Sequence, residues 1–144
     1  MEYYGDPMQR YNHINFTPPE SVAAVAEKGL DYRKRAGGKG GLSVSEAKKE
    51  GIGSGVQRAV NLKNRDTMSP STVKRMKAFF DRHEKNKAIN PEYKNEPWKD
   101  HGYVAHLLWG GDPGKVWAEK IVKRMEDADG EKALKVAFNY LGKN

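Results

Sequence analysis

The sequence predicts an all-α protein, a compact bundle of about six short helices with a helix-turn-helix-like core. Helix-start signals recur along the chain: a Ser, Thr or Asp able to cap the first turn, followed by a proline or a glutamate. Behind each start, apolar residues recur at spacings of three and four, which is the period of a helix that buries one face. Glycines then mark several helix ends. An irregular N-terminal arm and one long loop complete the expected architecture.

The composition is consistent with this fold. A chain of 144 residues fits one domain with a modest core. Although 31% of the residues are charged, three Trp, four Phe and seven Tyr provide aromatic side chains for that core. The absence of cysteine excludes disulfides and thiolate chemistry. No apolar run approaches the ~20 residues of a membrane span, and the first residues lack the layout of a secretory signal.

Three segments are expected: residues 1–16 as an arm, residues 17–126 as the helical domain and residues 127–144 as a C-terminal amphipathic helix. The arm carries Tyr3, Tyr4, Tyr11, His13 and Phe16. These residues follow no helical period, so the arm is predicted to be irregular. It either packs back on the body through its aromatic side chains or docks on a partner.

The first helix is predicted to begin at Thr17, with Pro18 at the first helical position and Glu20 three residues after the cap. Its apolar face consists of Val22, Val25, Ala26 and Gly29. The glycine-rich segment 37–41 ends it. We interpret this segment as a flexible joint, because it lacks the Gly-Lys-Ser/Thr signature of a phosphate-binding loop.

Three short helices are predicted next, from a capping box at Ser43 and Glu46, from Ser54, and from Ser69 with Pro70. The apolar positions expected to face the body are Ala47, Ile52, Val56, Val60, Val73, Met76 and Phe80, with Phe79 at the edge. A glycine turn joins the first two helices. This block therefore has the layout of a helix-turn-helix.

Residues 86–100 form the longest stretch without a helical period. A loop of this length in a small domain is usually functional or mobile. We expect Trp98 to pin it to the body. Tyr93 and Trp98, together with Lys94 and Lys99, offer a surface on which unpaired bases could stack.

A Trp-rich hairpin follows the loop. A short buried helix is predicted to end at Trp109-Gly110-Gly111, and Asp112-Pro113 is predicted to begin the next helix. We interpret Trp109 and Trp117 as core anchors. The apolar face of the last helix consists of Leu134, Ala137, Phe138 and Leu141. That face either caps the body or pairs with another chain.

Positive charge is concentrated in the middle of the chain. The net charge is +7, and residues 43–99 carry +6 of it, with 13 basic and 7 acidic side chains. This excess coincides with the helix-turn-helix block, which favours an anionic partner, most simply nucleic acid. The residues expected to contact it are Gln57, Arg58 and Asn61 at base edges, and Lys63, Arg65, Lys74, Arg75 and Lys77 at phosphates.

Part of this block resembles the helix-turn-helix of lactose-repressor-type regulators. The matching pieces are Gly51-Ile52-Gly53, Val56-Gln57-Arg58-Ala59-Val60-Asn61 and Ser69-Pro70-Ser71-Thr72. The resemblance implies that residues 56–61 form a recognition helix in the major groove of DNA. The spacing from Gly51 to Val56 is one residue shorter than in that family. Either the turn closes differently or the recognition helix is rotated.

A second resemblance covers more of the chain. The segments GLDYRKRAGGKGG, GVQRAVNL, SPSTVKRMKAFFDRHEKN and HLLWGGDPGKVWAEKI are similar to a small domain of bacteriophage proteins. Some of those proteins are encoded with, or fused to, head-maturation proteins. The resemblance implies a compact fold and a phage context, and with it a location in the cytoplasm of the infected host or in the virion.

Two functions are consistent with these observations. The first is a phage-encoded DNA-binding protein, with DNA expected in preference to RNA. The alternative is a virion or assembly protein that contacts other phage structural proteins and touches the packaged genome. An enzyme is not expected, because His13, His83, His101 and His106 join no nucleophile, carboxylate pair or metal set at a workable spacing. No cofactor, metal or membrane contact is expected, and homo-oligomerisation is left open.

Overall fold

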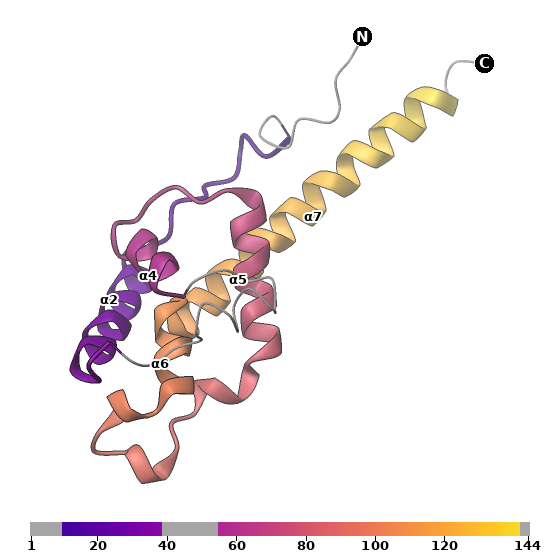
Figure 1. Cartoon of the computed structure of the whole chain (residues 1–144). Helices are drawn as coiled ribbons and strands as arrows, with labels where there is room; N and C mark the ends of the chain where they lie inside the picture. The colour runs from indigo at the N-terminus through magenta and orange to yellow at the C-terminus, as the bar shows by residue number, and fades with distance from the viewer. Residues whose placement is uncertain (1–9, 39–54, 142–144) are drawn as a thin grey trace.

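The computed structural model describes residues 10–38 and 55–141, and the predicted all-α bundle is confirmed. Its α-helices are α2 (Glu20–Arg35), α4 (Gly55–Lys63), α5 (Pro70–Arg82), α6 (His101–Leu108) and α7 (Gly111–Leu141). The predicted loop between α5 and α6 contains three short 3-10 helices, η1 (Glu84–Lys87), η2 (Pro91–Tyr93) and η3 (Pro97–Lys99). Helix α6 lies in the middle, between the α2–α4 pair and α5, while α7 runs out of the body (Figure 1).

Trp109, at the end of α6, is the centre of the hydrophobic core. Its side chain is 1% exposed and stacks on Phe79 of α5, with the two ring centroids 4.6 Å apart. Trp117 is 7% exposed, so both tryptophans are core residues and the prediction is confirmed. The prediction that Phe79 lies at the core edge is wrong. Phe79 and Phe80 are both buried, because α5 packs between the tryptophan and α7.

Helices α2 and α6 cross at Gly29 with their backbones in close contact. A Cβ atom on Gly29 would lie 2.8 Å from the backbone nitrogen of Leu108 and 2.9 Å from the carbonyl carbon of Leu107. Such distances are far below van der Waals contact, so only glycine fits here without moving a helix. This crossing brings the C-terminal part of α2 beside the loop that precedes α6.

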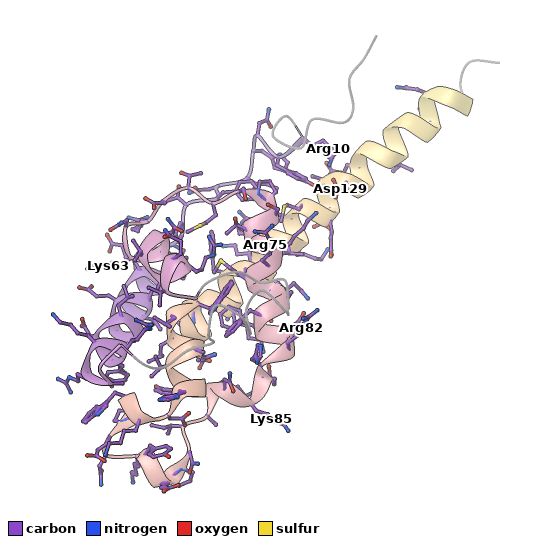
Figure 2. The ribbon with its side chains drawn as sticks, viewed as in Figure 1. Arg10, Lys63, Arg75, Arg82, Lys85 and Asp129 are labelled. Carbon is purple, nitrogen blue, oxygen red and sulfur yellow. The ribbon has the colours of Figure 1, made fainter. Side chains whose placement is uncertain are left out.

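The N-terminal arm packs on the body, as far as the described residues reach. Tyr11, Ile14 and Phe16 are buried. The Tyr11 hydroxyl donates to the carboxylate of Asp129 on α7 at 2.8 Å, and Arg10 lies beside the same carboxylate (Figure 2). Of the two alternatives, packing on the body therefore holds for residues 10–16, whereas Tyr3 and Tyr4 lie outside the described residues.

The start of α2 differs from the prediction. Thr17 is not the cap: the helix begins at Glu20, and Pro19 is the N-cap residue without a side-chain cap. The carbonyl of Pro19 accepts the first helical bonds, and Thr17 Oγ1 lies 3.2 Å from Thr67 Oγ1 instead. Two consecutive prolines keep the residues before them extended, which delays the helix. By contrast, the predicted Ser69 cap of α5 is confirmed, since its hydroxyl accepts from the Thr72 amide.

Helix α7 is continuous from Gly111 to Leu141, so the predicted boundary between residues 126 and 127 is wrong. Met125 and Ala128 are both buried, so the packing of α7 on the body continues across that point. Gly130 lies inside the helix, where a glycine costs only about 1 kcal/mol relative to alanine and does not break it. Leu134 and Phe138, further along, are 72% and 76% exposed.

Candidate nucleic-acid interface

Helix α4 is the expected recognition helix, and it is rotated relative to that expectation. Gly55, Ala59 and Leu62 are buried, whereas Val60, predicted to face inward, is 38% exposed. Arg58, predicted to face the groove, lies with its guanidinium 5.7 Å from the centroid of the Trp109 ring. The prediction that Val60 faces inward is wrong, and Arg58 lies partly against the core. Both differences correspond to a rotation of the helix by about one residue, or about 100°.

The first helix of the predicted helix-turn-helix lies in residues 39–54, outside the described part of the chain. So do the capping box at Ser43 and the predicted cap at Ser54. The glycine joint at residues 37–41 is described only at its start. Gly37 and Gly38 have left-handed φ angles of 72° and 82°, which end α2 at Arg35 as predicted.

Arg58 and Arg75 form a pair of like charges next to the core. Arg58 is half-buried, and its Nε has no hydrogen-bond partner among the described residues. Burial lowers the pKa of Arg58, and the nearby charge of Arg75 lowers it further. Lys74, beside Arg75 on α5, is exposed. We call these three residues the α4–α5 basic surface. Within residues 10–38 and 55–141, none of the three forms an ion pair with a carboxylate.

Gln57 and Asn61, the other two predicted base-reading residues, do lie on the outer side of α4. Their side chains are linked to each other, with Gln57 Nε2 donating to Asn61 Oδ1 at 3.4 Å. Asn61 also donates to the carboxylate of Asp66 at 3.0 Å. The amides are therefore partly engaged within the protein, and Asp66 adds a negative charge to this face.

Lys63 and Arg65 lie at the end of α4. Lys63 is exposed on the α2–α4 side of the body, away from Arg75 on α5 (Figure 2). Arg65 adopts a left-handed φ of 53°, and its Nε donates to the carbonyl of Pro18 at 2.8 Å. It also lies 3.7 Å from a carboxylate oxygen of Glu20. These contacts give Arg65 a structural role in holding the start of α2 to the end of α4.

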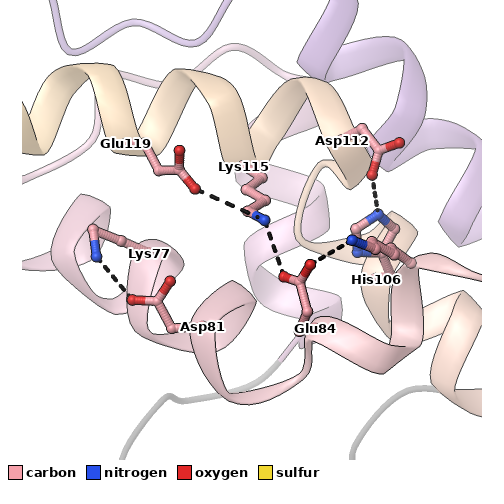
Figure 3. Close-up of polar contacts among 8 residues, drawn as sticks. Lys77, Asp81, Glu84, His106, Asp112, Lys115 and Glu119 are labelled. Carbon is pink, nitrogen blue, oxygen red and sulfur yellow. Dashed lines mark hydrogen bonds and ion pairs between the residues drawn. The ribbon is translucent and has the colours of Figure 1, made fainter.

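Lys77 belongs to a group of compensated charges on α5, η1 and α7 (Figure 3). It pairs with Asp81 at 2.8 Å, and Lys115 pairs with Glu84 at 3.0 Å. Hydrogen bonds from Lys87 and Lys115 lower the pKa of Glu84 to about 2. The charges of Lys77, Lys87 and Lys115 are matched by carboxylates, so this group of residues carries little net positive charge.

His106 and Asp112 form a polar contact that the sequence reasoning missed, with the histidine buried and the carboxylate largely exposed. They lie six residues apart, across the glycine turn between α6 and α7, and His106 Nε2 is 2.9 Å from Asp112 Oδ1. His106 is 4% exposed, and its ring contacts Phe80 edge-on. A histidine this buried has no access to a substrate. No group of His, Asp or Glu in the described residues could hold a metal ion.

We expect the stability of the protein to fall below about pH 6.5, in part because of His106. Burial lowers the pKa of His106 from its ordinary value of 6.5, and Asp112 offsets only part of that effect. The unfolded chain therefore takes up a proton before the folded protein does. The contribution is fully present above pH 6.5 and is lost as the pH falls through the folded pKa.

Urea denaturation between about pH 7.5 and pH 5 measures this loss. His106→Gln should lose less stability over this range than the parent, because it removes the histidine whose pKa is lowered by burial. A His106→Gln variant with the parental pH dependence would contradict the prediction.

A hollow of about 420 Å³ lies between the end of α2 and the start of α6. It is lined by Arg35, Ala36, Tyr93, Trp98, Lys99 and His101. The sequence singled out Tyr93, Trp98 and Lys99. It missed Arg35, which only the crossing of α2 and α6 brings to the loop, and His101, which directly follows the loop and begins α6.

No protein-family model, curated protein or solved structure matches this chain. None of the described helices is long and apolar enough to cross a membrane.

Proposed function

We propose that the protein binds nucleic acid, DNA in preference to RNA, through phosphate contacts made by the α4–α5 basic surface. The observation that carries this proposal is the half-buried Arg58 beside Arg75. Two neighbouring guanidinium groups repel each other, and burying one without a hydrogen-bond partner costs further free energy. A phosphate group would relieve both costs, because guanidinium binds phosphate oxygens in a bidentate manner.

The structure favours contact with the phosphate backbone of the nucleic acid over recognition of its base edges. Arg58 lies against Trp109 and not on the outer face of α4, and the amides of Gln57 and Asn61 are linked to each other and to Asp66. Phosphate contacts position a protein on nucleic acid without specifying sequence. The proposal includes the phage context implied by the second resemblance, with the protein acting on DNA in the infected cell.

Replacing Arg75 with alanine should weaken duplex binding and reduce its salt dependence. Three phosphate contacts give a slope of log affinity against log salt of about −2.7, so affinity falls about 40-fold between 50 and 200 mM salt. Removing one contact should make the slope less steep by about one. Fluorescence anisotropy of a labelled DNA duplex at several salt concentrations measures both quantities.

Lys77→Ala is the matched control, because it removes the same charge from the same helix. Lys77 is paired with Asp81, so the salt slope of this variant should stay at the parental value. Equal slope changes in the two variants would mean that only total charge matters. Absence of binding by the parent protein, even at low salt, would end the proposal.

A role in virion assembly is the second candidate, and the exposed apolar residues of α7 favour it. Leu134 and Phe138, four residues apart, lie one above the other on a helix and are both more than 70% exposed. Exposed apolar pairs of this kind are common in protein contacts, with phage structural proteins or with a second copy of the chain. Detection of the protein in purified particles would support this candidate, and its confinement to the infected cytosol would count against it.

A further inference from the structure

The hollow beside Trp98 combines aromatic and cationic side chains from two distant parts of the chain. Trp98 is half-buried, and its ring meets the ring of Tyr32 on α2 edge-on, with the centroids 6.5 Å apart. The guanidinium of Arg35 lies 5.2 Å from the centroid of the Trp98 ring. Tyr93 and His101 complete the wall. We call this feature the Trp98 hollow.

The loop that builds the Trp98 hollow is held in place by its own polar contacts. One oxygen of the Asp100 carboxylate accepts from the backbone amide of Asn90 at 2.7 Å, and the other accepts from that of Tyr103 at 3.0 Å. A single side chain thus ties the middle of the loop, just before η2, to the first turn of α6. The Asn90 side chain also caps η2 by accepting from the Glu92 amide. The aromatic side chains are therefore positioned before any ligand arrives, which reduces the entropy lost on binding.

The charge of the Trp98 hollow is positive. Arg35 and Lys99 are the cations that line it, and no carboxylate does. Lys99 is paired with Glu96 at 2.8 Å, outside the wall. Arg35 has no carboxylate partner within the described chain, so its charge is available to an anion. Stacking surfaces next to an uncompensated guanidinium match a ligand that joins an aromatic base to a phosphate.

We propose that the Trp98 hollow binds one unpaired nucleotide, with its base against Trp98 and Tyr93 and its phosphate at Arg35. A volume of about 420 Å³ is within the range of small-molecule sites. A base in a duplex is stacked on its neighbours and does not reach such a wall, so the ligand is a nucleotide of a single strand or a free nucleotide. This inference rests on the proposed function, because it takes nucleic acid as the partner. The Trp98 hollow is, however, a different surface from the α4–α5 basic surface.

The test measures binding of the full-length protein to a labelled single-stranded oligothymidylate by anisotropy, with a labelled duplex alongside. Trp98→Ala should weaken single-strand binding about tenfold, because stacking on an aromatic side chain is lost. Trp98→Leu keeps an apolar side chain in the loop and should show a loss of similar size. Arg35→Gln should weaken single-strand binding as well, whereas Lys34→Gln, at the exposed residue before it, should not. Duplex affinity should be unchanged in both Trp98 variants.

Competition by thymidine monophosphate identifies the source of the nucleotide. Displacement of the strand at millimolar concentration indicates a site for free nucleotides, and no displacement indicates a site for a strand; both results support the inference. Trp98→Leu binding the strand as tightly as the parent would overturn it, even if duplex binding still depended on Arg75. The opposite result is also possible: single-strand binding depends on Trp98, but Arg75→Ala leaves the salt slope of duplex binding unchanged. That result would overturn the α4–α5 basic surface as a binding site and support the Trp98 hollow. A parent that binds neither probe would overturn both.

Discussion

Trp109→Ala should lower the free energy of unfolding by about 3–5 kcal/mol, the range for large aromatic side chains removed from a core. The indole is 1% exposed and stacks on Phe79. The guanidinium of Arg58 lies over the indole ring. The indole also lies against Gly55, where a Cβ atom would be 3.1 Å from the indole nitrogen. Its loss would leave a cavity between α4, α5 and α6. For a small domain, this is a large share of the total stability.

Urea denaturation followed by far-ultraviolet circular dichroism measures this effect, since the fold is helical. Trp98→Ala is the control: its side chain is only half-buried at the edge of the fold, so it should cost about 1 kcal/mol or less. Equal stability of the Trp109 variant and the parent would contradict the central place of Trp109 in the core.

Gly29→Ala and Gly130→Ala should change stability in opposite directions, although both replace a helical glycine with alanine. At Gly29 the new methyl group meets backbone atoms of Leu107 and Leu108, and backbone cannot move aside as a side chain can. Helices α2 and α6 would have to separate, at a net cost of about 1–3 kcal/mol. At Gly130 nothing lies within 4 Å, so the higher helix propensity of alanine should stabilise the protein by roughly 0.5–1 kcal/mol.

The difference between the two denaturation midpoints is the sharpest measure, because the variants have identical composition. If Gly29→Ala were as stable as Gly130→Ala, the close crossing of α2 and α6 would be incorrect. The nucleotide site proposed at the Trp98 hollow would then also be unsupported, because that crossing places Arg35 beside the loop.

Local signals in the sequence were sufficient for most of the helices. Ser69 and Pro70 begin α5, and Gly37 ends α2, through interactions with residues only a few positions away. The core tryptophans could be recognised because a large apolar side chain at helical spacing has few other places to go. In each case the deciding physics is short-range or depends on hydrophobicity alone.

The orientation of α4 could not be predicted in the same way. Whether Arg58 faces solvent depends on its contact with Trp109, 51 positions later in the chain. The inward and outward positions of α4 were predicted from the recognition helix of the resembling family. In that family the turn before the helix is one residue longer. Likewise, only the α2–α6 crossing joins Arg35 to Trp98 and His101, and spacing in the sequence carries no trace of it.

The uninterrupted α7 has a mechanical consequence. A helix of 31 residues is about 46 Å long, and this one is anchored at its first turns by Trp117 and Ile121 in the core. No break in the described helix separates the anchored part from the part bearing Leu134 and Phe138. A partner that docked on those two side chains would therefore lie beyond the body along the helix axis, and a movement of that exposed end would be transmitted through continuous helix to the turns that pack in the core.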